Sequence, residues 1–208
     1  MRFIARQPIV DKDRQIFAHE LFFASSSGGG VASEDPERPT VPITLDDVTD
    51  DHLAFVNLSE EALVTGAARK LPPNTTVIEV LETVRPTGDV IEACRQLRRD
   101  GFRIALDDFL FRPELQSLVD LADFIKVEWP DVTKVLSLVR GKRLLQFVVE
   151  RIETEAQLVE AVAEGFDFFQ GYHLGRPKIV TGIELDRVDQ LCRLFGQVGS
   201  DDGEGAGL

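Results

Sequence analysis

Short apolar runs recur along this chain, and each ends at or beside a side chain that can bind a metal ion or move a proton. The runs are Gln15–Glu20, Leu53–Asn57, Thr76–Glu79, Arg103–Asp108, Phe124–Lys126, Leu144–Glu150 and Phe168–Gln170. Runs of this length, bounded by polar residues, are typical of buried strands. Parallel strands lying side by side would bring these polar ends together, as a parallel β/α barrel does at the carboxyl ends of its strands.

Helical patterns separate most of these runs. They cover residues 59–70, 89–100, 154–164 and 185–195, with apolar residues spaced along one face. Ser59 can cap the first of them, which Pro72 and Pro73 terminate, and Gly101 and Gly165 stop the next two. Strands joined by such helices pair in parallel with right-handed crossovers, so the sequence predicts an α/β fold of the TIM-like (β/α) barrel type.

One segment interrupts the alternation. From Ala24 to Pro42 the chain is rich in glycine, serine and proline, which exclude a long helix where a barrel would place its first one. We expect a flexible loop over residues 25–40, with at most a short helix after it. The 208 residues, 43% of them hydrophobic, suit a single barrel domain over 1–198, and the acidic, glycine-rich tail 199–208 should be disordered.

Charge and composition exclude several classes of partner. The net charge of −13 argues against a nucleic-acid polymer, whose phosphates need a basic surface. No apolar run approaches the roughly 18 residues of a membrane span, and no signal peptide precedes the first strand, so a cytoplasmic protein without a membrane partner is expected. Cys94 and Cys192 fall in helical patterns and are interpreted as packing thiols.

The motifs, taken in order, resemble those of the EAL domain. They are Gln7–Val10, Glu20–Phe22, Phe55–Ser59, Leu71–Pro73, Ile78–Thr83, Ala105–Phe109, Ile125–Val127, Val149–Gln157 and Phe169–Pro177. One such motif is weak, but the ordered set spans residues 3 to 195. The EAL family is known as a barrel with cyclic di-GMP phosphodiesterase activity, and it includes many non-catalytic members. The start, Ala5–Val10, most resembles degenerate EAL domains that are often joined to an HDOD domain.

The resemblance implies roles for particular residues. Five of them would hold one or two Mg²⁺ or Mn²⁺ ions, which favour oxygen ligands: Glu20, Asn57, Glu79, Asp107 and Asp108. Lys126 and Glu150 would have catalytic roles at the attacking water, and Gln7, Gln170 and Arg176 would contact the ligand. Each residue alone also has a plainer interpretation: Asp107-Asp108 as a helix cap or turn, and Lys126 as a surface lysine.

The chain departs from the active members at the ligand-binding positions. Leu110-Phe111-Arg112 replaces the small Gly-Thr-Gly loop that follows the paired aspartates, and Ala24 replaces an arginine that grips ligand phosphate. Glu128 stands where aspartate is usual, and Arg151 where glycine is usual. We expect large side chains at positions 110 and 111 to cover the site or to serve an interface.

These departures leave the function open between alternatives. The favoured hypothesis is a degenerate EAL-type signalling module without turnover, acting through a protein partner or homodimer, or through cyclic di-GMP binding. The first alternative is an active or weak metal-dependent cyclic di-GMP phosphodiesterase. The second is an unrelated metal-dependent barrel enzyme, since one barrel fold supports many chemistries.

Overall fold

The computed structural model describes residues 2–25, 45–108, 112–130 and 145–181, together with 191, 192 and 195. Most of the expected loop 25–40, the substituted positions 110 and 111, most of the expected helix 185–195 and the tail 199–208 lie outside these residues. Ser25 ends a strand, and Leu191, Cys192 and Phe195 are helical.

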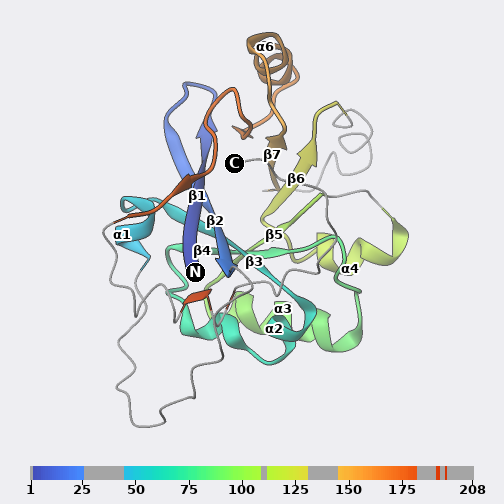
Figure 1. The fold of residues 1–208 in the computed structure, drawn as a ribbon. Helices are drawn as coiled ribbons and strands as arrows, with labels where there is room; N and C mark the ends of the chain where they lie inside the picture. The colour runs from blue at the N-terminus through green and yellow to red at the C-terminus, as the bar shows by residue number, and fades with distance from the viewer. Residues whose placement is uncertain are drawn as a thin grey trace.

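The described strands form a closed barrel (Figure 1). They are β1 Arg2–Asp11, β2 Ile16–Ser25, β3 Leu53–Leu58, β4 Thr76–Val80, β5 Arg103–Leu106, β6 Phe124–Glu128, β7 Gln146–Glu150, β8 Phe168–Phe169 and β9 Lys178–Ile179. From β2 to β8 each strand pairs in parallel with the next, and β1 closes the barrel by pairing with both β8 and β2. The predicted TIM-like barrel is confirmed.

Strand β1 runs antiparallel to both of its barrel neighbours. The sequence interpretation identified a strand here but did not predict its direction. The cause is the tight turn between β1 and β2, in which the Asp11 side chain accepts hydrogen bonds from the backbone N–H groups of Asp13 and Gln15, both at 2.9 Å. So short a connection joins only antiparallel strands, whereas a parallel pair needs a long crossover.

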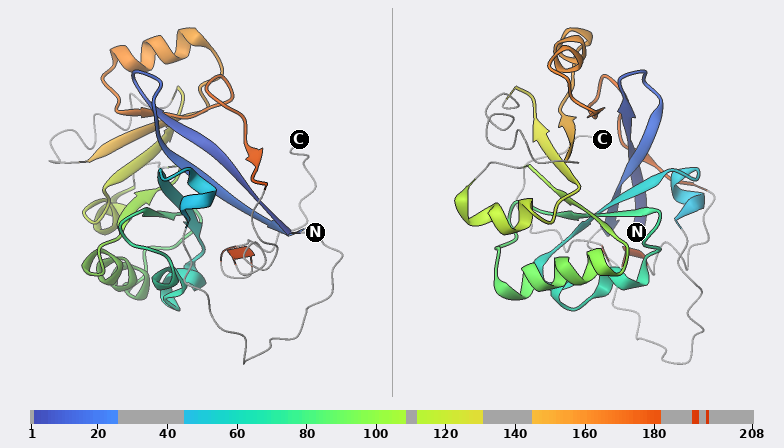
Figure 2. Two further views of the ribbon diagram at one scale, coloured as in Figure 1. Left: turned by 90° about the vertical axis from the view of Figure 1, so that its left-hand side faces the viewer. Right: turned by 180° about the vertical axis from the view of Figure 1, so that it is seen from behind.

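The helices lie outside the barrel, with α2, α3 and α4 on the side of β3–β6 and α6 near the end of β7 (Figures 1 and 2). They are α1 Asp46–Thr49, α2 Glu60–Val64, the 3₁₀ helix η1 Ala67–Lys70, α3 Gly88–Arg99, the 3₁₀ helix η2 Pro113–Leu115, α4 Gln116–Val119 and α6 Glu155–Ala163. The four-residue α1 agrees with the short helix expected after the loop. A single helix over 59–70 is wrong, because Gly66 adopts a left-handed conformation that separates α2 from η1.

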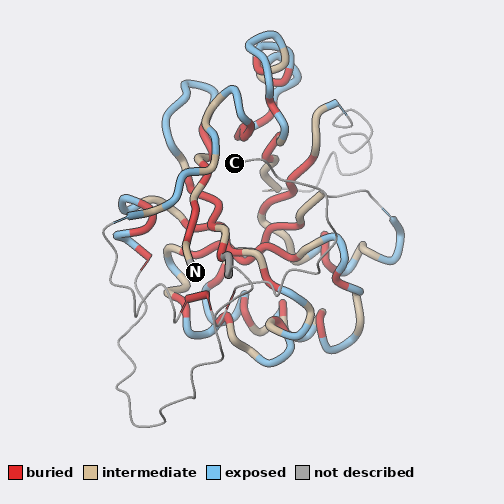
Figure 3. The backbone as a smooth tube through the Cα atoms, viewed as in Figure 1, coloured by how far each residue is buried: buried red, intermediate tan, exposed pale blue. Residues whose placement is uncertain are grey.

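The two faces of the strands form two separate apolar clusters. The outward faces pack against the helices, and Figure 3 shows the strands as the most buried part of the backbone. The inward faces fill the barrel with an apolar plug, which consists of Ile9, Ala18, Phe55, Val77, Ala105, Phe124, Val148 and Phe168. Phe124 packs edge-on against Phe55, with ring centroids 5.2 Å apart. The plug closes the barrel interior below the carboxyl ends of the strands.

A close backbone contact fixes the chain where it leaves β8. A Cβ atom on Gly171 would lie 2.2 Å from the carbonyl oxygen of Ile152, so only glycine fits there. We predict that Gly171→Ala lowers the free energy of unfolding by roughly 2–4 kcal/mol, since backbone must shift to admit the methyl group. Urea unfolding measures this change. Gly88→Ala is the control, because nothing lies within 4 Å of its added Cβ; equal stability of the two variants would contradict the contact.

Candidate functional site

The inward face of every barrel strand changes from apolar to polar toward one mouth of the barrel. Side chains two residues apart share a face of a strand. In six strands a plug residue is followed, two positions later, by a polar residue: Glu20, Asn57, Glu79, Asp107, Lys126 and Glu150. Gln170 follows Phe168 in the same way, and Gln7 precedes Ile9 on the antiparallel β1. These eight residues form the polar layer of the barrel.

The Lys126 ammonium lies at the centre of the polar layer. Its Nζ atom is 3.1 Å from Glu20 Oε2, 2.5 Å from Glu79 Oε1, 3.0 Å from Asp107 Oδ1 and 2.9 Å from Glu150 Oε1. The Lys126 side chain is 1% exposed, so the plainer interpretation of a surface lysine is wrong. Four strands, β2, β4, β5 and β7, therefore direct a carboxylate at one cation from β6.

Burial and mutual repulsion shift the titration of this cluster. Burial raises the pKa of Glu79 well above its usual value, and burial also raises the pKa of Asp107; in both cases Lys126 offsets part of the effect. Burial raises the pKa of Glu150 to about 7, against the opposing attraction of Lys126. Burial lowers the pKa of Lys126, but the surrounding carboxylates, Glu150 first, raise it well above its usual value. One ammonium thus does not balance four carboxylates, and part of the cluster takes up protons or another cation.

Amide side chains hold the carboxylate of Glu20 from two sides. Asn57 Nδ2 donates to Glu20 Oε1 at 2.9 Å, and Gln170 Nε2 donates to Glu20 Oε2 at 2.7 Å. Gln170 Nε2 also lies 3.1 Å from Gln7 Oε1, while Gln7 Nε2 donates to the carbonyl of Gly175. These bonds fix the direction of Glu20, and they leave the amide oxygens of Asn57 and Gln170 pointing elsewhere.

Within the described part of the chain, several buried oxygens of the layer have no hydrogen-bond partner. They include Asn57 Oδ1, Gln170 Oε1 and both carboxylate oxygens of Glu79. Glu79 Oε1 is close to the Lys126 ammonium but without hydrogen-bond geometry, so only the ionic attraction serves it. Buried oxygens without donors are costly in an apolar interior. Amide and carboxylate oxygens are the ligands that Mg²⁺ and Mn²⁺ prefer, so the residues present fit a divalent cation.

A second group of acidic residues faces the mouth. Asp107, Asp108 and Glu150 each offer a carboxylate oxygen, and these atoms all lie within 4.8 Å of one another. Asp108 follows Asp107 with a left-handed backbone, φ 42°, which breaks the strand alternation. Asp107 therefore belongs both to the Lys126 cluster and to this outer group, and its position between them suits a pair of metal sites.

The polar layer opens into a cavity of about 440 Å³. Its walls include Gln7, Glu20, Asp107, Asp108, Lys126, Glu150 and Gln170, and also Phe22, Glu128, Arg151, Glu153, Gly171 and Tyr172. The sequence interpretation did not assign a role to Tyr172, although Tyr172 lies two residues after Gln170 in the same motif. Arg176, predicted to contact the ligand, does not line this cavity; its guanidinium lies over the Tyr172 ring, 4.6 Å from the centroid.

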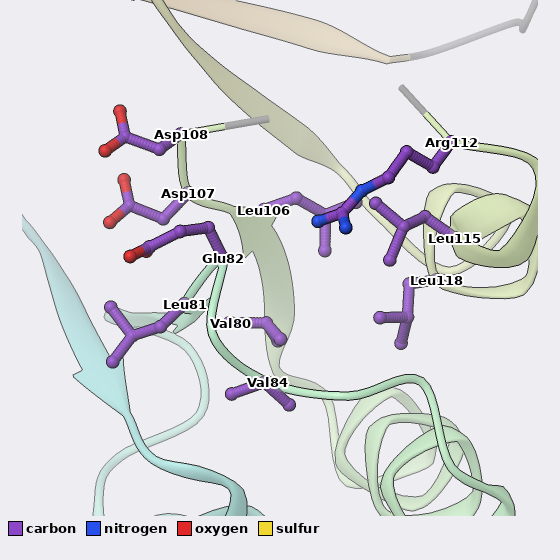
Figure 4. A pocket seen from close by; sticks show the side chains of 10 residues that line it. All are labelled: Val80, Leu81, Glu82, Val84, Leu106, Asp107, Asp108, Arg112, Leu115 and Leu118. Atoms are coloured by element: carbon purple, nitrogen blue, oxygen red, sulfur yellow. The ribbon is translucent and has the colours of Figure 1, made fainter. Parts of the chain in front are cut away.

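A smaller hollow of about 30 Å³ lies behind the paired aspartates (Figure 4). Asp107 and Asp108 point to the same side in this view, away from Leu115 and Leu118. The Arg112 side chain lines this hollow and does not line the larger cavity. Arg112, the described residue of the substituted loop, is exposed and shares this hollow with apolar residues and with Glu82, Asp107 and Asp108.

Two curated proteins are similar to this chain. It is 30% identical over 200 residues to the uncharacterized protein YuxH of Bacillus subtilis and 31% identical over 194 residues to the cyclic di-GMP phosphodiesterase CdgJ of Vibrio cholerae. These matches cover 88% and 86% of this chain, but 49% and 45% of the relatives, so the chain spans about half of their length. No family model matches the chain.

Solved EAL domains share the fold. The EAL domain of Mycobacterium smegmatis DcpA aligns with a TM-score of 0.63 at 18% identity, over 96% of this chain and all of that domain. The Bacillus subtilis YkuI protein, which has an EAL domain and was solved with cyclic di-GMP and calcium, gives 0.60 at 21% identity over 92% of this chain and 60% of its own. The resemblance to EAL domains expected from the sequence is confirmed, and the barrel has their fold.

The raised pKa of Glu150 predicts a pH dependence of stability. Because burial raises this pKa from 4.5 to about 7, the folded chain keeps a proton on Glu150 where the unfolded chain has lost it. The corresponding stability is fully present below pH 4.5 and is lost as the pH rises through 7. Glu150→Gln imitates the protonated form, so it should exceed the unaltered protein by roughly 1–3 kcal/mol at pH 8 and match it near pH 4.5.

Urea unfolding at several pH values, with a chelator to remove metal ions, measures this difference. Glu153→Gln removes a carboxylate from an exposed position at the same mouth and is the matched control. If the advantage of Glu150→Gln at pH 8 is absent, burial does not govern this carboxyl group.

Proposed function

We propose that this EAL-type barrel binds cyclic di-GMP through Mg²⁺ or Mn²⁺ and acts as a signalling module with little or no turnover. The observation that carries the proposal is the polar layer, in which carboxylate and amide oxygens from different strands converge without enough donors to satisfy them. A cation at the layer would satisfy these oxygens, and the adjoining cavity has room for a ligand.

Residues of the polar layer would have distinct tasks in this site. Glu20, Asn57, Glu79, Asp107 and Asp108 would hold the metal. When bound, Mg²⁺ or Mn²⁺ there would neutralise phosphate charge and make a coordinated water more acidic. The relatives support the ligand class, since the Vibrio protein is named for cyclic di-GMP and YkuI was solved with cyclic di-GMP and calcium.

Lys126 and Glu150 would stabilise negative charge and transfer protons at the site. Lys126, held by four carboxylates, would attract a phosphate oxygen or a water at the floor of the cavity. Burial raises the pKa of Glu150 to about 7, so this group can hold or release a proton near neutral pH. Gln7 and Gln170 would orient Glu20 and the ligand above it.

The sequence departures argue against efficient turnover. Ala24 cannot make the bidentate phosphate contact of an arginine, and Leu110-Phe111 cannot give the close backbone approach of glycine. A regulatory module of this kind would act on a protein partner or as a homodimer. Within the described residues, no helix is both long and apolar enough to cross a membrane.

A second candidate function is a metal-dependent cyclic di-GMP phosphodiesterase. Two observations favour it: the metal-ligand residues all meet at one mouth with Lys126, and the relative that is 31% identical is named as such an enzyme. The two functions share the binding site and differ in whether the phosphodiester bond is cut.

The metal site predicts a thermal shift. Because an ion that binds only the folded protein stabilises it, millimolar Mn²⁺ should raise the melting temperature by about 3–6 °C. Asp107→Asn, which weakens a ligand shared by both acidic groups, should lose most of this gain. Asp89→Asn on the exposed face of α3 is the matched control and should keep it. An unchanged melting curve of the unaltered protein would mean that the site holds no metal.

Binding and hydrolysis assays separate the two functions. With Ca²⁺ or Mn²⁺ present, we expect isothermal titration to show cyclic di-GMP binding, and chromatography with Mn²⁺ to show little linear dinucleotide over many equivalents of substrate. Many turnovers, abolished by Lys126→Met, would replace the regulatory proposal with the phosphodiesterase. Absence of cyclic di-GMP binding under all these conditions would rule out both candidate functions.

A further inference from the structure

Arg151 occupies an unusual place at the mouth of the barrel. It directly follows β7, whose last residue, Glu150, points inward. In a regular strand the next side chain would point to the opposite face. Arg151 instead has a left-handed backbone, φ 57°, and lines the same cavity as Glu150. Side chains of L-residues disfavour this conformation, so an arginine held in it at a candidate site invites a functional explanation.

Glu128 holds the Arg151 guanidinium in an ion pair. Glu128 ends β6, lies opposite Glu150 in the strand register and forms an ion pair with Arg151. The Arg151 side chain is 67% exposed and that of Glu128 is 32% exposed. An ion pair in such contact with water contributes little to stability, so the guanidinium can exchange Glu128 for another anion at small cost.

The charges around the cavity show why an anionic ligand would need this arginine. Among its described lining residues, the carboxylates are Glu20, Asp107, Asp108, Glu128, Glu150 and Glu153, and the cations are Lys126 and Arg151. Four carboxylates already surround Lys126 at 2.5–3.1 Å. Of these two lining cations, Arg151 is the more accessible, since its side chain is 67% exposed and that of Lys126 is 1% exposed.

We propose that Arg151 is a ligand-binding residue that takes the phosphate of a cyclic dinucleotide, and that Glu128 competes with the ligand for it. The inference rests on the proposed function, because it places a phosphodiester in the cavity. A planar guanidinium presents paired donors that match two phosphate oxygens. Arg151, directly after β7, would thus supply the kind of contact that Ala24 on β2 cannot make.

Competition between Glu128 and phosphate makes opposite predictions for the two partners. Arg151→Gln keeps a long polar side chain and removes the charge, so it should weaken cyclic di-GMP binding about tenfold. Glu128→Gln removes the competing anion and should tighten binding about threefold. In the double variant the effect of Glu128→Gln should vanish, because its benefit depends on Arg151.

Isothermal titration of the folded chain with cyclic di-GMP and Ca²⁺ measures all four proteins. The matched control is the exposed pair Arg99 and Glu92 on α3, 2.5 Å apart and outside the cavity, changed to glutamine in the same way. These control variants should bind as the unaltered protein does. A structural role for Arg151 is tested separately by melting: Arg151→Gly relieves the left-handed backbone, so it should keep or raise the melting temperature while weakening binding.

The outcomes distinguish failure of the Arg151 inference from failure of the proposed function. If the unaltered protein binds cyclic di-GMP and Arg151→Gln binds equally well, the role of Arg151 is overturned and the proposed function stands. If Glu128→Gln tightens binding equally with and without Arg151, the competition is wrong and general charge repulsion explains the effect. If the unaltered protein with Ca²⁺ binds no cyclic di-GMP, the proposed ligand and the inference fall together.

Discussion

The interaction of one buried ammonium with four carboxylates governs this barrel. Lys126 lies directly above the apolar plug, two residues beyond Phe124 on the same strand face, where the aromatic rings keep water away. In so dry a place each ion pair is strong, but every unbalanced charge is costly. The plug and the cluster are thus parts of one arrangement: the plug lowers the local polarity, and burial there raises the pKa values of Glu79, Asp107 and Glu150.

The excess of carboxylates over cations in the polar layer lowers the stability of the fold but favours the binding of a cation. A layer built only for stability would pair each carboxylate with a donor or replace it with an apolar residue. Here the fully buried Glu79 has the Lys126 ammonium beside one of its two oxygens. Asn57 directs its N–H donor to Glu20, while its oxygen has no hydrogen-bond partner among the described residues. The proposed cation would remove this cost. Strand pairing on both sides keeps these side chains in place, so the oxygens that would bind an ion are already positioned.

Local patterns in the sequence predict the strands and the inward polar residues, since both depend on a period of two along a short segment. Closure of the barrel depends on contacts between residues far apart in the sequence, so local patterns do not predict it. The antiparallel direction of β1 follows from the Asp11 turn, and the break at Gly66 depends on one left-handed residue. The surrounding of Lys126 by four carboxylates depends on four other strands, with the most distant partner, Glu20, 106 residues away in the chain. Residue types predicted a metal site, but only the register of the strands shows that the lysine lies at the centre of the polar layer.

The role of a residue that departs from the family pattern depends on the residues that it contacts in the fold. Taken one at a time, Glu128 and Arg151 look like losses, since each replaces the usual residue of the motif. In the folded chain they are partners at the ends of adjacent strands β6 and β7, and both face the cavity. A glycine at position 151 would leave Glu128 without this cation, and Arg151 without Glu128 would leave a charge open to any anion. The two residues therefore act together, as an ion pair at the mouth of the cavity.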